Sequence, residues 1–487
     1  MTYLAIPIQT SDIETSAISM QQAIDAGAEL LELRLDYLDN TAPENVSAIV
    51  QSAKKFNVPL IATCRPEWEG GQSTATDLQR IEILKTAVAA GADYVDIELI
   101  TQEKENIDFS PAKTIVSNHD FEKCPDDLAE RVNRIKSTHH DIIKIAYLAR
   151  HINDSFAALD IMHNNPGAIA MAMGPDGVIT RMLAKKLNSL LTFARLDNGT
   201  APGQPTIAEM KNIFRWDKLQ PSTKTFGLIG NPVDHSKGPI THNNSFNKLN
   251  FDGLYLRFLI QGSQNEFFAF MDNIKQRPYL DIKGFSITLP HKQNALEYVN
   301  HVDGQLDPVV KKMGAINTII FDNTGKPTGY NTDCSGALSA IYETMNIAKS
   351  DLANMPVAII GAGGVSRALV AGLTDAAADI TIYNRTLAKA EELAATFNCK
   401  SASISEINKL KARLVINCTS IGMEPDYLSS PVPADVLRPD MIVFDTVYTP
   451  EMTQLLKDAQ AAGAAIVKGT KMFQHQAADQ RNLFTKQ

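Results

Sequence analysis

Residues 142–147 read Ile-Ile-Lys-Ile-Ala-Tyr, a run of β-branched and apolar residues that a single lysine interrupts. A short run of this kind is typical of a buried β-strand. Similar runs recur through the first 196 residues, with amphipathic helical stretches between them. The predicted strands are residues 4–8, 30–35, 60–64, 94–99, 114–117, 142–147, 168–173 and 190–194, and the predicted helices include residues 17–26, 76–90 and 126–136. Eight strands that alternate with helices predict an α/β fold with a closed (β/α)8 barrel, and an open doubly wound sheet is the alternative.

Length and composition agree with a globular protein of several domains. The chain has 487 residues, enough for about three domains at roughly 150 residues each. Hydrophobic residues make up 44% and charged residues 21% of the chain, the usual mix of a soluble fold. The formal net charge is -9 at pH 7, so the chain lacks the basic character that nucleic acids and anionic membranes attract. We expect small-molecule substrates and no nucleic-acid or membrane partner.

The cysteines and the N-terminus bear on the cellular compartment. The five cysteines are scattered and never spaced as Cys-x-x-Cys, a pattern that favours reduced thiols over disulfides or a metal site. The first ten residues carry no basic targeting region, and no apolar run approaches the roughly 18 residues of a membrane span. We therefore expect a cytoplasmic protein without a metal site, while the sequence predicts no particular oligomeric state.

Polar residues at the carboxyl ends of the predicted strands are the first candidates for chemistry. In a barrel these ends open at one mouth, which collects Glu32, Arg34, Arg65, His119 and Lys144. Lys144 lies among branched apolar residues, where desolvation would lower the pKa of its amine and make it a nucleophile. His119 ends the preceding strand and is a candidate general base. A solvent-facing lysine and a structural histidine remain the alternatives.

Four ordered motifs carry a family resemblance. The segments are Glu-Leu-Arg-Leu-Asp at 32–36, Ala-Thr-Cys-Arg-Pro at 62–66, Ser-Asn-His-Asp at 117–120 and Ile-Lys-Ile-Ala at 143–146, and the match continues at 172–174, 179–181 and 201–204. Together they resemble type I 3-dehydroquinate dehydratase over most of residues 1–215. The resemblance implies that Lys144 forms an imine with the ring ketone of 3-dehydroquinate, that His119 moves the protons, and that Glu69 orients His119.

The resemblance also implies a substrate-binding set in the barrel. Planar arginine donors suit the substrate carboxylate, and polar side chains suit its hydroxyls. The expected carboxylate partners are Arg34, Arg65 and Arg181, and the expected hydroxyl partners are Glu32, Gln204 and Thr200. The family usually has serine at the position of Thr200, so this chain keeps the hydroxyl and adds a methyl group.

A second unit follows a polar stretch with a proline at 215–224, which we interpret as a linker before a strand at 225–229. Its motifs are Gly-Asn-Pro-Val-Asp-His-Ser-Lys-Gly-Pro at 230–239, Ser-Ile-Thr-Leu-Pro-His-Lys at 286–292, Gly-Ala-Ile-Asn-Thr at 314–318 and Gly-Tyr-Asn-Thr-Asp at 329–333. This set resembles shikimate dehydrogenase. The resemblance implies a proton-transferring dyad of Lys292 and Asp333, and substrate contacts from Ser236, Thr288, Asn317, Tyr448 and Gln476.

A glycine-rich turn in the second unit predicts a nucleotide site. The strand 357–360 leads into Gly-Ala-Gly-Gly at 361–364 and then a helix over 366–373, the order that brings a pyrophosphate to a helix N-terminus. About 20 residues further on, Arg385 stands where an NAD site usually has an acid, and an arginine there favours the 2′-phosphate of NADP. The predicted cofactor residues are Gly361, Gly363, Gly364, Val365, Asn384, Arg385, Thr386, Thr419 and Gly469.

These observations predict a barrel at 1–215, a substrate-binding lobe at 222–335, a Rossmann NADP lobe at 336–450 and a C-terminal segment at 451–487 that returns to the substrate lobe. The hypothesis is a bifunctional shikimate-pathway enzyme that dehydrates 3-dehydroquinate and reduces 3-dehydroshikimate to shikimate with NADPH. At Gly238 the family usually has a second serine. Its loss costs a carboxylate donor worth about 1 kcal/mol and opens space for quinate. A catabolic quinate dehydrogenase is therefore one alternative. The resemblance leaves a second alternative, a non-catalytic ligand sensor.

Overall fold

The computed structural model describes residues 1–196, 203–234 and 236–486. The chain divides into two compact units. The first comprises residues 1–227 and 232–282, and the second comprises residues 228–231 and 283–487.

Eight parallel strands open the first unit and form one sheet in the order β7-β6-β5-β4-β3-β2-β1-β8. The strands are β1 (Tyr3–Gln9), β2 (Leu30–Arg34), β3 (Leu60–Thr63), β4 (Tyr94–Glu98), β5 (Lys113–Asp120), β6 (Ile142–Leu148), β7 (Ile169–Met173) and β8 (Leu191–Phe193). A parallel bridge between Gly167 and Ser189 joins the two ends of the sheet. Each of the eight predicted strands is present, and the predicted (β/α)8 barrel is confirmed.

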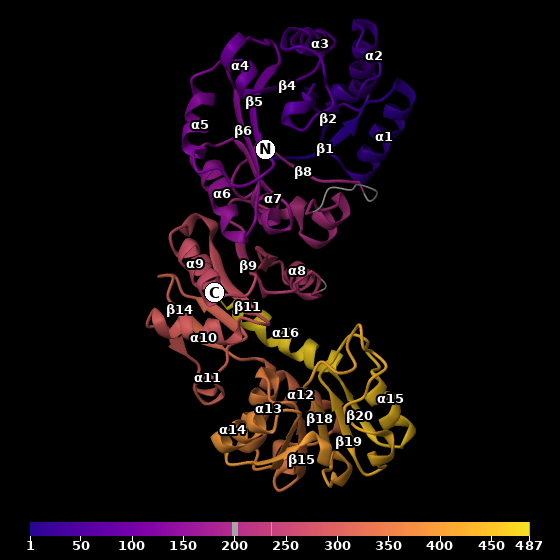
Figure 1. The fold of residues 1–487 in the computed structure, drawn as a ribbon, viewed down its shortest axis with the longest axis vertical. Coiled ribbons are helices and arrows are strands. Elements are labelled where there is room, and N and C mark those ends of the chain that lie inside the picture. Colours follow the sequence, from indigo (N-terminus) through magenta and orange to yellow (C-terminus); the bar gives the residue numbers. More distant parts are fainter. Residues whose placement is uncertain (197–202, 235, 487) are drawn as a thin grey trace. The chain divides into compact units, whose positions relative to one another are not determined.

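Helices follow the strands and surround the sheet, in indigo to magenta in Figure 1. They are α1 (Ile13–Ala26), α2 (Pro43–Lys54), α3 (Asp77–Ala89), α4 (Leu99–Glu105), α5 (Leu128–Lys136), α6 (Ser155–Asn164) and α7 (Val178–Leu183). Local sequence sets their ends. Thr76 and Gln79 form a capping box at the start of α3, and Gly27, with φ of 99°, ends α1 in the left-handed conformation. The three helices predicted here are confirmed to within a few residues, except that α1 starts four residues earlier.

The inward face of the barrel changes from apolar to polar along the strands. Its amino-terminal part is a core that includes Leu30, Ile115 and Ile142. Two residues further along the same strands the side chains are Glu32, Ser117 and Lys144. Side chains two apart in a strand share a face, so the polar residues form a layer above this core, toward the carboxyl ends where barrel enzymes place their chemistry.

The segment at 215–224, predicted as a linker, is folded and partly buried. Trp216 is fully buried, and its indole nitrogen donates to Glu29 Oε2 over 3.2 Å. Arg215 donates from Nε to the side chain of Asn247 over 2.8 Å. A large apolar ring within a polar stretch is the sequence signal for this burial, because a tryptophan in a solvated linker would leave its ring in water.

A second sheet has six strands in the order β10-β9-β11-β13-β14-β12. Its strands are β9 (Lys224–Gly230), β10 (Gly253–Leu259), β11 (Ile282–Ile287), β12 (Gln305–Leu306), β13 (Thr318–Phe321) and β14 (Pro327–Tyr330). Helices α8 (Gly238–Lys248), α9 (Gln264–Lys275), α10 (Lys292–His301) and α11 (Pro308–Met313) connect them. Strand β13 runs antiparallel to β11 and β14, so the sheet is mixed.

The third sheet is parallel throughout, with strand order β17-β16-β15-β18-β19-β20. Its strands are β15 (Pro356–Ile360), β16 (Asp379–Asn384), β17 (Lys400–Ser403), β18 (Leu414–Asn417), β19 (Ile442–Asp445) and β20 (Ala465–Lys468). Its helices are α12 (Asp333–Met345), α13 (Gly364–Asp375), α14 (Leu387–Phe397), α15 (Gln454–Ala461) and α16 (Gly469–Thr485). This open parallel sheet is the predicted Rossmann lobe. Helix α13 begins two residues earlier than predicted, directly on the glycine turn.

Helices α12 and α16 pack closely within the second unit. A Cβ at Gly336 would lie 2.9 Å from the backbone nitrogen of Gln476, so only glycine permits this approach. Figure 1 shows α16, in yellow, beside α12 and reaching the strands of the second sheet. Helix α16 therefore brings the C-terminal segment back to the second sheet, where Gln480 forms hydrogen bonds to Ser286, Asn317 and Thr318.

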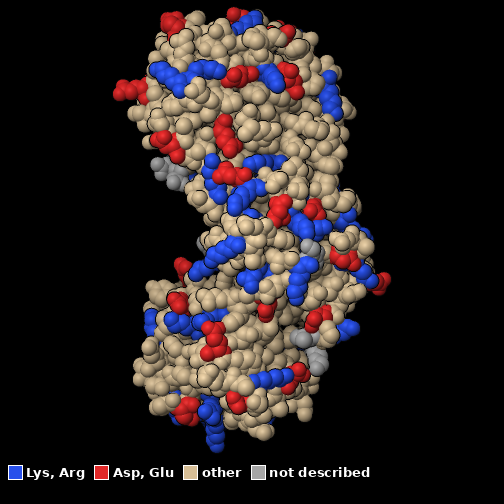
Figure 2. Space-filling model, turned by 180° about the vertical axis from the view of Figure 1, so that it is seen from behind, with Lys and Arg blue, Asp and Glu red and all other residues tan. Residues whose placement is uncertain are grey.

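Charges of both signs are interspersed over the face of the molecule in Figure 2. In the parts of the chain that the structure describes, no helix is long and apolar enough to cross a membrane. All five cysteines are free thiols.

Candidate active sites

Lys144 points into the barrel from β6 and is only 4% exposed. Its Nζ donates to Asp96 Oδ2 over 2.6 Å and lies 3.7 Å from Glu32 Oε1. It also lies 5.1 Å from the centre of the Phe193 ring. The expected apolar surroundings are corrected here. Neighbours of Lys144 in the sequence point to the other face of the strand, whereas its neighbours in space include two carboxylates.

His119 is held by Glu69 at the end of β5. The backbone amide of His119 donates to Glu69 Oε1 over 2.7 Å, and Nδ1 lies 3.0 Å from the same oxygen. An ionised carboxylate only accepts hydrogen bonds, so Nδ1 carries the hydrogen and Nε2 presents its lone pair. Burial, with help from Arg65 and Lys144, holds the pKa of His119 well below its usual range. His119 is therefore neutral near pH 7 and suited to accept a proton.

Burial raises the pKa of Glu69 to about 7, although Arg65 and the His119 amide oppose this change. Phe121 stacks on the His119 ring with 6.0 Å between ring centres and 9° between planes. A Cβ at Gly70 would lie 2.5 Å from the Phe121 ring, so the small residue after Glu69 makes room for this ring. Glu69 and Phe121 together fix the orientation of His119.

The three arginines predicted to bind the substrate differ in what they contact. Arg34 forms two hydrogen bonds to Asp36, at 2.9 and 2.7 Å. Arg65 is buried and donates to Asp96 and Glu98 at 2.7 and 2.8 Å. These carboxylates raise the pKa of Arg65 against the effect of its burial.

Of these three arginines, Arg181 alone contacts no carboxylate among the described residues. It projects from α7, is buried, and makes two long contacts of 3.5 Å, to Met171 Sδ and to the carbonyl of Phe193. Burial lowers its pKa to about 10. A buried guanidinium with only such contacts is stabilised by an anionic partner, so Arg181 fits a substrate carboxylate best.

Asp96, Glu98 and Arg80 belong to this site and were missed by sequence reasoning. Arg80 Nη1 donates to Glu98 Oε2 over 2.5 Å, and Glu98 also accepts from Arg65. Burial raises the pKa of Asp96, but Arg65 and Lys144 outweigh it and hold that pKa well below its usual range. The sequence signal was available, since Tyr-Val-Asp-Ile-Glu at 94–98 places two acids on one face of an apolar strand.

Thr200 and Gln204 are the remaining predicted substrate contacts of the barrel. Thr200 lies outside the described residues. Gln204 is placed by its backbone carbonyl, which accepts a hydrogen bond from Arg195 Nε over 2.8 Å, and it lines a separate cavity with Arg195.

Lys292 and Asp333 form the predicted dyad in the second unit. Lys292 Nζ lies 2.5 Å from Asp333 Oδ2, at the first turns of α10 and α12. Asn317 Nδ2 donates to the other carboxylate oxygen over 2.9 Å. One cation and one neutral amide thus hold the two carboxylate oxygens of Asp333. Asp333 is only 3% exposed, so little water reaches this pair.

Gln480 was not predicted and supports Asn317 from α16. Its Nε2 donates to the Asn317 carbonyl over 3.3 Å and to Thr318 Oγ1 over 2.9 Å, and its Oε1 accepts from Ser286. Gln476, the predicted residue one turn earlier, packs its backbone on Gly336. Only the packing of α16 on the sheet distinguishes these two glutamines.

Thr288 follows β11 and Ser236 lies in the segment after β9, and both are predicted substrate contacts. Thr288 is half-buried after β11, and its backbone amide donates to Ile229 over 2.9 Å. Ser236 Oγ accepts from the Gly238 amide over 3.1 Å. A Cβ at Gly238 would lie 3.2 Å from Ser236 Oγ and 3.3 Å from the Tyr255 ring. The space expected beside Gly238 is therefore largely filled.

The glycine turn has the form that a dinucleotide requires. Gly361 has φ of 108°, and a Cβ there would lie 3.0 Å from Thr419 Cγ2. No side chain caps the start of α13 at Gly364, so its first amides are available to a pyrophosphate. A Cβ at Gly364 would lie 3.7 Å from Lys292 Cδ, which brings the dyad close to the turn. Val365 follows in the first turn of α13.

The end of β16 offers donors for a nucleotide phosphate. Asn384 Nδ2 donates to the Thr386 carbonyl over 2.8 Å and shapes the turn. Arg385 and Thr386 are exposed beside it. Because β16 pairs with β15 up to Ile360, this turn adjoins the glycine turn, and the residues present fit NADP.

Tyr448 and Gly469 lie at the start of the C-terminal helix. The Tyr448 ring stacks on Phe473 with 5.2 Å between centres. A Cβ at Gly469 would lie 2.4 Å from the Val447 carbonyl, so glycine is required where α16 begins.

Models of known families match three consecutive parts of the chain. Residues 4–221 match type I 3-dehydroquinase. Residues 228–319 match the shikimate dehydrogenase substrate binding domain, and residues 343–424 match shikimate / quinate 5-dehydrogenase.

Relatives agree with this division. The bifunctional 3-dehydroquinate dehydratase/shikimate dehydrogenase of Arabidopsis thaliana, described as chloroplastic, is 36% identical over 506 residues, which is 99% of this chain and 82% of that protein. The shikimate dehydrogenase (NADP(+)) of Caldanaerobacter subterraneus is 37% identical over 268 residues, 53% of this chain and 91% of that protein. A crystal structure of a shikimate dehydrogenase in complex with NADP+ superimposes with a TM-score of 0.50 at 33% identity, covering 55% of this chain and 92% of that one. The chain belongs to the family of bifunctional 3-dehydroquinate dehydratase/shikimate dehydrogenases.

Proposed function

We propose that this chain dehydrates 3-dehydroquinate to 3-dehydroshikimate in its barrel and reduces that product to shikimate with NADPH in its second half. The observation that carries the proposal is the presence of two complete proton-handling sites in one chain. These are Lys144 with His119 and Glu69 in the barrel, and Lys292 with Asp333 in the second unit.

In the barrel, Lys144 is the nucleophile. After it loses its proton, the amine adds to the ring ketone, and loss of water leaves an iminium that draws electrons from the adjacent carbon. His119 Nε2 takes the proton from that carbon. The imidazolium then gives a proton to the tertiary hydroxyl, which leaves as water, and hydrolysis of the imine restores the lysine.

Substrate binding in the barrel rests on charge. Arg181 holds the substrate carboxylate, because its buried guanidinium contacts only a thioether and a carbonyl. Glu32, which accepts from Thr63 over 2.9 Å and lies near Lys144, is placed to bind a hydroxyl of the ring. Arg65 acts chiefly by holding Asp96, and hence Lys144, in position.

In the second unit, Lys292 donates a proton to the carbonyl oxygen of 3-dehydroshikimate as that carbon is reduced. Bound NADPH supplies the hydride. Asp333 orients Lys292, and Asn317 fixes the carboxylate of Asp333. The turn at Gly361 and Gly364 holds the pyrophosphate, and Arg385 pairs with the 2′-phosphate, with Asn384 and Thr386 beside it. Ser236, Thr288 and Asn317 hydrogen-bond the hydroxyls and carboxylate of the substrate.

We assign one domain to dehydration and two lobes with a C-terminal segment to reduction. The barrel occupies residues 1–215, the substrate-binding lobe 222–335, the nucleotide lobe 336–450 and the returning C-terminal segment 451–487. The three sheets support a barrel and two lobes. Strand β20 (Ala465–Lys468) belongs to the sheet of the nucleotide lobe, so that lobe extends past residue 450, and α16 (Gly469–Thr485) is the segment that returns to the substrate lobe. We place the protein in the cytoplasm, in keeping with five free thiols, with small molecules as its ligands and neither nucleic acid nor membrane as a partner. Cell fractionation with an antibody to the chain tests the location.

Shikimate is favoured over quinate as the ligand of the second unit. Quinate carries one more hydroxyl, but Ser236 and Tyr255 already occupy most of the space beside Gly238. We expect kcat/KM for shikimate to exceed that for quinate at least tenfold, about 1.4 kcal/mol of discrimination. Equal values would favour a quinate dehydrogenase.

A coupled assay tests both activities at once. The purified chain is mixed with 3-dehydroquinate and NADPH, and oxidation of NADPH is followed by absorbance. Steady oxidation that depends on 3-dehydroquinate is the expected result. Oxidation only after 3-dehydroshikimate is added would contradict the proposed dehydratase activity of the barrel. Ligand binding without any turnover would favour a non-catalytic ligand sensor.

A further inference from the structure

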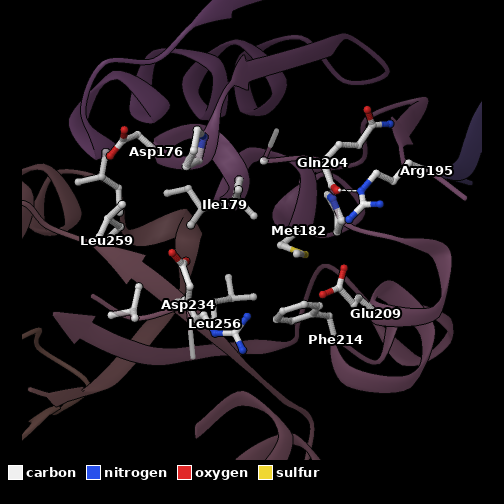
Figure 3. A pocket seen from close by; sticks show the side chains of 17 residues that line it. Asp176, Ile179, Met182, Arg195, Gln204, Glu209, Phe214, Asp234, Leu256 and Leu259 are labelled. Carbon is white, nitrogen blue, oxygen red and sulfur yellow. Dashed lines mark hydrogen bonds between the residues drawn. The ribbon is translucent and has the colours of Figure 1, made fainter. Parts of the chain in front are cut away.

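A cavity of about 220 Å³ lies within the first unit, and Lys144, His119 and Glu69 are not among its lining residues. Its walls come from α7 and the segment after β8 in the barrel, and from β10 and the segment after β9 (Figure 3). Neither catalytic mechanism described above uses this space.

The middle of the cavity is apolar. Ile179 and Met182 project from α7, Leu256 from β10, and Phe214 closes one side (Figure 3). All four side chains are buried. An apolar cavity of about 150 Å³ already accepts a benzene ring. This cavity therefore has room for a medium-sized apolar side chain and a few polar atoms.

Charged groups of both signs surround the apolar middle. In Figure 3, Asp176 and Asp234 lie on one side of Ile179 and Met182, while Arg195 and Glu209 lie on the other. Arg257 belongs to the lining as well and feels the charge of Asp234, which raises its pKa against the larger effect of burial.

Two buried polar atoms in the lining have no hydrogen-bond partner among the described residues. They are Nε of Arg257 and Oδ1 of Asp176. The other end of the Arg257 guanidinium donates to the Ser236 carbonyl over 3.1 Å. Leaving a buried polar atom unpaired costs about 1–3 kcal/mol, and a ligand that supplies the missing partner recovers that free energy. The pairing that Arg257 lacks is an acceptor, and a carboxylate is the acceptor a guanidinium binds best.

The neighbourhood of a cation, an acid and an apolar middle selects one chemical class of ligand. A simple carboxylic acid would pair Arg257 alone, whereas a ligand that also carries an ammonium gains a second charge pair with the exposed carboxylate of Asp234. We propose that this cavity binds a free α-amino acid with an apolar side chain. Its carboxylate pairs with Arg257, its ammonium with Asp234, and its side chain lies between Met182, Leu256 and Phe214.

Calorimetry with a matched set of ligands tests the proposal. The probes are L-phenylalanine, 3-phenylpropanoate, which lacks the ammonium, 2-phenylethylamine, which lacks the carboxylate, and L-alanine, which lacks the apolar group. We expect L-phenylalanine to bind with a Kd of about 1 mM or below, and each of the others at least tenfold more weakly. Equal binding of 3-phenylpropanoate, or no binding of L-phenylalanine, would overturn the proposal.

Variants separate this site from unspecific binding. Arg257→Gln and Asp234→Asn should each weaken L-phenylalanine at least tenfold. Asp126→Asn changes an acid whose side chain is 93% exposed, and should leave both binding and activity unchanged. Dehydratase activity and Tm report whether the variants fold. If both variants fold and bind L-phenylalanine as the parent does, the ligand lies elsewhere.

The same contacts predict an effect on the second site, and this consequence rests on the proposed function. Arg257 holds the carbonyl of Ser236, which we assign to the substrate. Bound amino acid should therefore change the Kd of shikimate, and shikimate should change the Kd of the amino acid by the same factor. An unchanged Kd for shikimate at saturating L-phenylalanine would overturn this coupling.

Discussion

The barrel and the second unit each pair a lysine with a buried aspartate, at 2.6 Å for Lys144 and Asp96 and 2.5 Å for Lys292 and Asp333. The two pairs differ in what surrounds them. Asp96 also accepts from Arg65, which bonds Glu98, which in turn bonds Arg80, so signs alternate through a buried network.

The dyad of the second unit instead has neutral supports. Asn317 holds Asp333, and Gln480 and Thr332 hold Asn317. The surrounding charges of opposite sign hold Lys144 in place. Arg181 remains able to bind an anion in the barrel. Neutral amides fix the dyad without adding charges that would compete for its proton. The comparison teaches that the same ion pair acquires different chemistry from its surroundings.

Lys144→Ala should produce the largest difference between its effects on dehydration and on shikimate oxidation. Loss of the amine placed to form the imine should lower dehydration at least about 10³-fold, while shikimate oxidation stays within twofold. Both rates are measured on one preparation. Lys292→Ala is the matched control and should show the opposite pattern. Similar loss of both activities in either variant would contradict two independent sites.

Asp333→Asn tests the neutral supports of the dyad. The amide removes the charge that orients and balances Lys292, so kcat for shikimate oxidation should fall about 10²–10³-fold. Dehydration should be unaffected. A change confined to the KM for shikimate would instead make Asp333 a binding residue.

Arg385→Ala should act on the cofactor alone. Losing a charged hydrogen bond to a phosphate, worth about 1.5–3 kcal/mol, should raise the KM for NADPH roughly ten- to hundredfold. The KM for shikimate and the dehydration rate should not change. The control is Arg413→Ala, an exposed arginine directly before the amino end of β18, whereas Arg385 follows the carboxyl end of the parallel strand β16. An unchanged KM for NADPH would contradict the assignment of Arg385 to the 2′-phosphate.

The pH profile of dehydration should show the smallest effect. Glu69 has a pKa raised to about 7, so it gains a proton as pH falls below about 7 and loses the negative charge that makes it a strong acceptor from Nδ1 of His119. The pKa of His119 itself is lowered, so its own protonation follows at lower pH. The dehydration rate should therefore fall severalfold between about pH 7 and 6.

Glu69→Gln separates these two titrations. Glutamine keeps an acceptor oxygen but gains no proton, so the acid limb of the dehydration profile should move to lower pH. The profile of shikimate oxidation is the internal reference and should be the same in both proteins. A limb that stays near pH 7 in the variant would assign it to another group.

Much of the molecule was readable from sequence. Strand and helix order follows from local hydrophobic periodicity, so the eight barrel strands and the Rossmann turn could be predicted, as could the pairing of Lys292 with Asp333 from motifs at 286–292 and 329–333. The burial of Trp216 and the tight fit around Gly238 were not predicted, because each depends on residues distant in the chain.

The sequence by itself determined which strands form and which face of each carries polar residues, since alternation along a strand is local. Only the tertiary structure decided which of those polar residues meet. Closing the barrel brings Asp96 of β4 to Lys144 of β6, and packing α16 on the sheet brings Gln480 to Asn317 and Thr318. The physical reason is that hydrogen bonds and charge pairs act over a few ångströms of space, whereas sequence patterns report only neighbours along the chain.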